Sequence, residues 1–159
     1  MIMQSGSKEK LLFKLNQLAE INNHRIQGYE KAISETEDEF LANLFINIAA
    51  HSRYFKSDLS KGILLLGGET TNATKTSDDF IQAWIFIKAA LLGKRKKEIL
   101  ESCEFEENLT LETYKAILNE DDHILTDDLR RLIEMQRQEL QLDCNLVKEL
   151  KESEKINKQ

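Results

Sequence analysis

The chain has 159 residues and a formal net charge of -6, and it contains no proline and only six glycines. A length of this order fits a single domain that buries a core of its own. The negative charge argues against a nucleic-acid-binding protein, which needs a basic face, and no apolar run approaches the roughly 18 residues of a membrane-spanning helix. Because proline breaks helices and glycine weakens them, the composition favours an all-α fold.

The expected organisation is one domain over residues 1–159, with an ordered core at about 8–152. The N-terminal segment lacks the apolar stretch that a secretory signal peptide needs. Cys103 and Cys144 fall on apolar helical stripes, and we predict buried free thiols, which fit a reducing compartment. The sequence therefore predicts a soluble, cytoplasmic protein that binds neither a membrane nor nucleic acid.

Two long amphipathic helices are predicted in the first half of the chain. The first is expected over about 7–35 and the second over about 37–67, because Gly67 readily takes the left-handed conformation that ends a helix. Apolar side chains recur every three or four residues in both segments, and a few polar residues interrupt these stripes. The polar members of the two stripes include Asn22, Arg25 and Ser52.

A short helix is predicted over 78–92, after a polar loop at 70–76. At about 1.5 Å per helical residue, the loop and this helix can carry the chain back along much of a helical bundle. The next long helix would then run parallel to the second, as in bundles with one long crossover. The short helix is apolar on more than one face, so it either caps the bundle or contacts a second copy in a homodimer.

Two further long helices complete the prediction, one over about 94–118 and one that begins after a capping residue, Thr126. A turn at 119–123 joins them, and the residues after about 150 are expected to fray. Heptad-like spacing in four long helices predicts a four-helix bundle with an extra short helix in the crossover between the second and third. The polar members of the last two stripes include Glu107, Gln136 and Asp143.

Several segments carry a resemblance to a known family: LNQLAEINNHRIQGYEKAI, LGGE, FIQAWIFIKAALLG, ILESCEFEENLTLETYKAIL and the stretch from Gln136 through Leu150. In order and spacing they resemble the bacterial ferritin-like bundles of domain of unknown function 2383, over about 11–150. The resemblance implies a ferritin-like four-helix bundle, no established activity and, by fold-level analogy, a stress-associated role. The family pattern commonly has histidine at the position of Cys144, so this chain lacks that imidazole.

A metal centre is the competing interpretation of the polar core. Ferritin-like di-iron proteins take a Glu-x-x-His pair from each of two helices, and a Glu from each of the other two. The only such pair here, Glu120 and His123, falls in the predicted turn. We therefore predict no cofactor, with Fe or Mn at a non-standard carboxylate site as the alternative. The weak candidates for ligands of such a site are Glu30, His51, Glu107 and Asp143.

The preferred interpretation is a buried polar layer near the middle of the bundle. A carboxylate inside a bundle is costly unless it is paired, and Arg25 is the expected partner of Glu107. Asn22 and Gln136 are expected to support this pair. Because desolvation offsets much of the attraction, such a layer fixes helix register more than it adds stability. We thus expect a non-enzymatic structural or interaction protein, and the alternative is a metal-dependent oxidoreductase or metal store.

Overall fold

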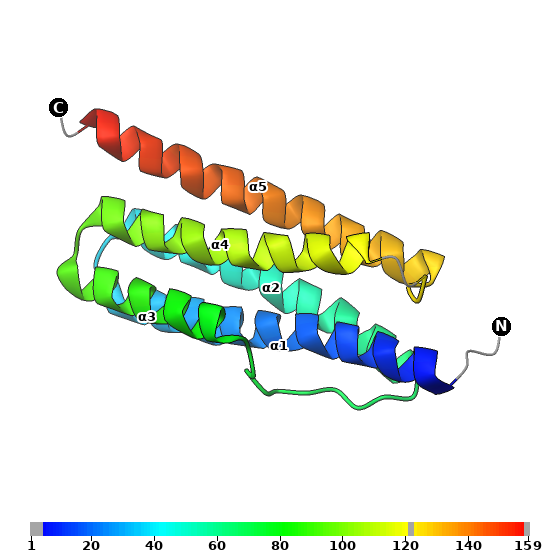
Figure 1. The fold of residues 1–159 in the computed structure, drawn as a ribbon. Helices are drawn as coiled ribbons and strands as arrows, with labels where there is room; N and C mark the ends of the chain where they lie inside the picture. The colour runs from blue at the N-terminus through cyan, green and yellow to red at the C-terminus, as the bar shows by residue number, and fades with distance from the viewer. Residues whose placement is uncertain (1–4, 121–122, 158–159) are drawn as a thin grey trace.

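The computed structural model describes residues 5–120 and 123–157, and all regular structure in these residues is helical. This confirms the predicted all-α class. The turn predicted over 119–123 contains Asp121 and Asp122, which lie outside the described residues. The helices, labelled in Figure 1, are α1 (Ser5–Glu35), α2 (Glu39–Leu65), α3 (Asp78–Gly93), α4 (Lys96–Asn119) and α5 (Asp127–Asn157).

The four long helices lie side by side, and α3 lies along one end of the group they form (Figure 1). The pair α1 and α2 packs as an antiparallel hairpin, as does the pair α4 and α5, while α3 packs against α4 and α1. The segment 66–77 runs back along α1 before α3 begins, so α2 and α4 point in the same direction. This is the crossover that the length of the connection predicts.

The ends of α2 follow from local chemistry. Asp38 is the N-cap, and its side chain accepts a hydrogen bond of 3.0 Å from the amide of Leu41, so the helix begins two residues later than predicted. After the last turn, Gly67 adopts φ +81, the left-handed conformation that was expected there. Glycine is suited to this position because it has no Cβ to clash with the preceding carbonyl.

The remaining helix ends differ from the prediction in two places. Gly93 is the last residue of α3, and Lys94 takes the left-handed conformation with φ 56, so α4 begins only at Lys96. At the start of α5, the Thr126 hydroxyl accepts a hydrogen bond of 3.3 Å from a backbone amide in the first turn, as a capping residue does. The helix then continues to Asn157, beyond the expected start of fraying.

The crossover segment is held against α1 by hydrogen bonds from side chains that the helical pattern of the sequence does not predict. Asn23 is buried, and its amide nitrogen donates hydrogen bonds of 2.9 Å to the carbonyl oxygens of both Thr71 and Ala73. The ring of His24 shares a hydrogen bond of 2.8 Å with the hydroxyl of Thr76. These contacts fix the path of the connection and therefore the position at which α3 begins.

Buried apolar side chains form two clusters that include residues from opposite halves of the long helices. One contains Tyr29, Phe45 and Cys103, and the other contains Leu15 and Tyr114. The residues between them in each long helix include buried polar ones, so a polar layer separates the two apolar clusters. Both cysteines, Cys103 and Cys144, are buried and free, as predicted.

Candidate functional site

Arg25 lies in the centre of the polar layer and is completely buried. Its Nε donates a hydrogen bond of 3.0 Å to the hydroxyl of Ser52 on α2. On α4, one terminal nitrogen donates to both carboxylate oxygens of Glu106, at 2.5 and 2.7 Å, and the other donates to Glu107 Oε1 at 3.2 Å. The guanidinium therefore joins three helices and contacts two carboxyl groups that are themselves 0 % exposed.

Two hydroxyl groups complete the surroundings of these carboxyl groups. Tyr29 donates a hydrogen bond of 3.0 Å to Glu107, and Thr110 donates one of 2.9 Å to Glu106. The apolar stripe of this helix predicts a buried Glu107 but not a buried Glu106, the residue that makes the shortest contact with Arg25. A signal was present, because Glu106 lies three residues after one buried position and four before another, which places it beside the apolar stripe.

The charges of the layer do not balance without a proton, because one guanidinium faces two carboxyl groups. Burial raises the pKa of Glu107 to about 7, an effect that Arg25 opposes and the neighbouring charge of Glu106 reinforces. Burial acts to lower the pKa of Arg25, but the two carboxylates outweigh it and raise that pKa well above its ordinary value. Arg25 therefore stays charged, and Glu107 gains or loses its proton near neutral pH.

Asn22 and Gln136 belong to a separate set of hydrogen bonds, so their predicted support of the Arg25–Glu107 pair is wrong. Asn22 donates a hydrogen bond of 3.0 Å to the hydroxyl of Tyr114, and that hydroxyl donates one of 2.6 Å to Gln136. The reason is that Tyr114 lies two turns beyond Glu107 on α4, and its long side chain reaches both amides.

His51 and Asp143 form the outer edge of the layer. The His51 Nδ1 and Asp143 Oδ2 atoms are 2.7 Å apart, and the side chain of His51 is 35 % exposed whereas that of Asp143 is 9 % exposed. Burial raises the pKa of Asp143, the hydrogen bond from His51 lowers it, and the charge of Glu107 raises it further. The pair therefore connects the buried layer with the surface of α2 and α5.

Of the four candidate metal ligands, only His51 and Asp143 are brought into contact. Glu30 is exposed on α1 and forms an ion pair with Arg53 of α2 at the surface. Glu107 instead faces the guanidinium of Arg25 inside the bundle. In residues 5–120 and 123–157, no group of three or more His, Cys, Asp or Glu side chains is arranged to hold a metal ion.

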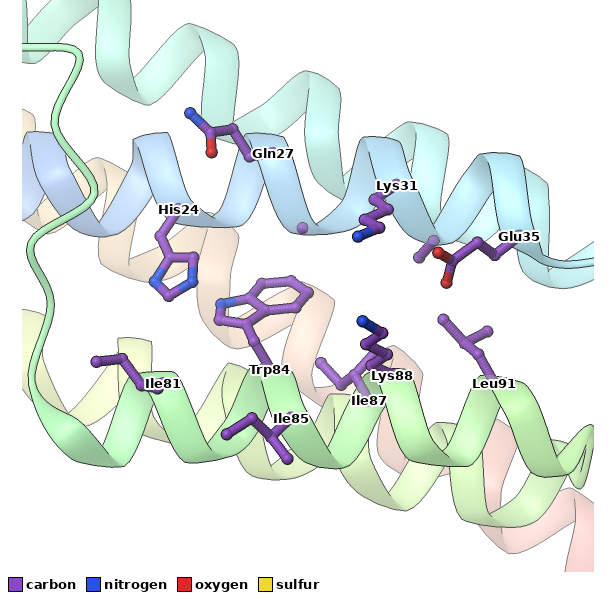
Figure 2. Close-up of a pocket in the computed structure, with 12 residues that line it drawn as sticks. His24, Gln27, Lys31, Glu35, Ile81, Trp84, Ile85, Ile87, Lys88 and Leu91 are labelled. Atoms are coloured by element: carbon purple, nitrogen blue, oxygen red, sulfur yellow. The ribbon is translucent and has the colours of Figure 1, made fainter.

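A second site, which we call the α1–α3 cavity, lies at the surface and has a volume of about 340 Å³ (Figure 2). Trp84 extends from α3 toward α1, where its indole ring packs against Gly28 and meets Tyr29 edge to face at 4.9 Å between ring centroids. A Cβ atom on Gly28 would lie 2.4 Å from the indole, so only glycine allows this contact. Lys31 and Lys88 extend into the cavity from opposite walls (Figure 2).

Among the described residues, none of the helices combines the length and apolar character needed to cross a membrane.

The comparisons with known proteins place the chain in a family without assigning it an activity. No curated protein matches the chain. Residues 10–120, which make up more than half of the sequence, match the family described as Domain of unknown function (DUF2383). The chain therefore belongs to the DUF2383 family.

Proposed function

We propose that this protein is a non-enzymatic, ferritin-like helical bundle of the cytoplasm that acts by association, with α3 as its contact surface for a second copy of the chain. The observation that carries the proposal is an apolar outer face on α3. Ile85, Phe86 and Leu92 are 54 %, 46 % and 75 % exposed. Clusters of exposed apolar side chains are typical of surfaces that bind another protein.

The apolar surface extends beyond α3 onto α4. The rings of Phe86 and Phe105 meet edge to face with their centroids 5.9 Å apart, and Phe105 is 42 % exposed. Aromatic side chains are enriched at protein interfaces because they bury much apolar area at a small cost in conformational entropy. A second copy supplies the same patch, so two chains related by a two-fold axis would cover both patches at once.

The polar layer supports a structural role in place of a catalytic one. Its carboxyl groups already contact Arg25, Tyr29 and Thr110, so they are engaged with other side chains of the protein. Four surface cavities in the described part of the chain, including the α1–α3 cavity, are lined by residues that do not belong to the polar layer, so none of these cavities gives a substrate access to its carboxyl groups. The proposal accordingly includes no cofactor, and protein purified without a chelator should contain iron and manganese well below one ion per chain.

The test is the mass of the protein in solution, measured by light scattering over a range of concentrations. The wild-type chain should approach about twice its 18.4 kDa mass at high micromolar concentration. The double substitution Phe86→Glu and Leu92→Glu should give a folded monomer, because it places charges on the patch and leaves the core unchanged. The matched control is Leu64→Glu with Leu65→Glu, two exposed leucines of α2, and this variant should remain a dimer.

A wild-type chain that stays monomeric at high micromolar concentration would contradict the proposal. Equal dissociation of the patch variant and the α2 control would also contradict it, because the effect would then follow from added charge and not from the surface of α3.

A further inference from the structure

We infer that the α1–α3 cavity binds a small carboxylate with an aromatic body. This site adjoins the outer face of α3: Ile85 lines the cavity, whereas Phe86 and Leu92 do not. The inference rests on the shape of the cavity, on its uncompensated positive charge and on a buried hydrogen-bond donor that lacks an acceptor.

The cavity has the size and lining of a small-molecule site. Its volume of about 340 Å³ lies within the range of roughly 300–1,000 Å³ that is common for ligand pockets. The indole of Trp84 provides a flat apolar surface, and the contacts with Gly28 and Tyr29 hold that ring in place without a ligand. A preformed aromatic surface favours a flat apolar ligand, because the ring is already fixed and its side chain loses little conformational entropy on binding.

The charged groups at the cavity select an anion. Lys31 and Lys88 approach from opposite walls, and neither forms an ion pair with another described residue. The opposing charge comes from one lining carboxylate, Glu35, while burial lowers the pKa of His24 so that its ring is neutral at neutral pH. The lining therefore carries a net charge of +1, although the whole chain carries a net charge of -6. This local positive charge favours an anionic ligand.

The indole N–H adds a polar contact that nothing in the described structure satisfies. Trp84 Nε1 is buried and has no hydrogen-bond partner. It lies on the side of the ring nearer His24, whereas the lysines lie on the other side (Figure 2). This N–H is closed to solvent in the structure, so a ligand oxygen reaches it only after a shift of the indole or of a neighbouring side chain. Because a buried donor without an acceptor is unfavourable, the hydrogen bond formed after that shift would strengthen binding. The expected ligand thus has a carboxylate at one end and a hydrogen-bond acceptor at the other.

The probe for this site is 3-(4-hydroxyphenyl)propionate, which has a carboxylate, an aromatic ring and a phenolic oxygen. Its binding can be followed through the fluorescence of Trp84, which is the only tryptophan of the chain. The neutral amide of the same acid and the cation tyramine carry the same ring. We expect saturable binding in the order carboxylate, amide, tyramine, and an affinity for the carboxylate that decreases as salt is added.

Substitutions then separate charge recognition from a general change in structure. Lys31→Gln and Lys88→Gln should each weaken carboxylate binding by about three- to tenfold, a modest effect because both lysines are exposed to solvent. Glu35→Gln should tighten binding by about two- to threefold, since it removes the one opposing charge. Lys61→Gln, an exposed position of α2 away from the cavity, is the matched control and should have no effect.

The variant Phe86→Ser with Leu92→Ser removes the apolar patch without placing a charge beside Lys88. It should bind the carboxylate as the wild-type chain does, which keeps this test independent of the proposed dimer. Three results would overturn the inference: no saturable binding up to millimolar probe, equal affinities for the carboxylate and its amide, or weaker binding by Glu35→Gln.

Discussion

The buried polar layer and the α1–α3 cavity both place charged side chains between helices. The charges of the layer are paired and buried, whereas those of the cavity are exposed to solvent. In the layer, Arg25 contacts two carboxyl groups, and all three side chains are removed from water. In the cavity, Lys31 and Lys88 keep their contact with solvent and form no ion pairs with the other residues that the structure describes. A buried charge is costly unless another charge or a hydrogen bond compensates it, whereas a charge in contact with solvent needs no partner and can bind a ligand. Our proposals accordingly give the layer the role of fixing helix register and the side of the molecule that carries α3 the role of recognition.

The largest expected effect is the loss of the cation from the layer. Arg25→Met keeps much of the side-chain volume but leaves Glu106 and Glu107 buried without their partner. The free energy of unfolding, measured with urea, should fall by about 3–5 kcal/mol. The control is Arg53→Met, which breaks a surface ion pair with Glu30 and should cost less than about 1 kcal/mol. Similar losses in the two variants would mean that the layer does not depend on Arg25.

The next effect is a dependence of stability on pH. Because the pKa of Glu107 is about 7 in the folded chain and 4.5 is its ordinary value, the folded state binds more protons than the unfolded state between these two values. Stability should therefore decrease as pH rises from about 4.5 to 7, by roughly 1–3 kcal/mol from this group. Asp143, whose pKa burial also raises from 3.8, contributes in the same direction at lower pH.

The pH effect of Glu107 can be isolated by substitution. Glu107→Gln mimics the protonated carboxyl group, so the difference in unfolding free energy between wild type and variant should change across this pH range. Urea unfolding at several pH values measures that difference. A constant difference from pH 4.5 to 7 would show that Glu107 has no raised pKa in the folded protein.

A smaller effect is expected at the contact between α1 and α3. Gly28→Ala would place a methyl group 2.4 Å from the indole ring of Trp84, so the ring must move, at a cost of about 1–3 kcal/mol. The emission of Trp84 should change in the same variant. Gly93→Ala is the control, because its methyl group would meet nothing within 4 Å at the end of a helix, and it should stabilise the chain by about 0.5–1 kcal/mol. An unchanged Trp84 emission in Gly28→Ala would refute the contact.

The helices and their directions were predictable, because they depend on local patterns and on the length of one connection. The period of the apolar residues located every long helix, and the segment before α4 was long enough to return along the bundle. The ends were less predictable. Lys94 takes the left-handed conformation next to a glycine that could have taken it, and sequence alone does not decide which of two neighbouring residues does so.

The site was predictable only in part. Arg25 and Glu107 lie on the apolar stripes of their helices and could be identified there, but a single stripe admits only one of two adjacent glutamates. Because α4 packs against α1, α3 and α5, it buries a wider arc than one stripe, and Glu106 falls within that arc. The approach of Lys31 to Lys88 could not be predicted, since it depends on how α3 lies along α1.

The central claim is that the polar layer maintains the fold while recognition takes place at α3. The most direct test is the solution mass of Glu107→Gln, which alters the centre of the layer and leaves the surface of α3 unchanged. The account predicts that this variant shifts the stability of the protein yet dimerises over the same concentration range as the wild-type chain. A folded Glu107→Gln chain that remains monomeric where the wild type is dimeric would contradict the account, because recognition would then depend on the layer itself.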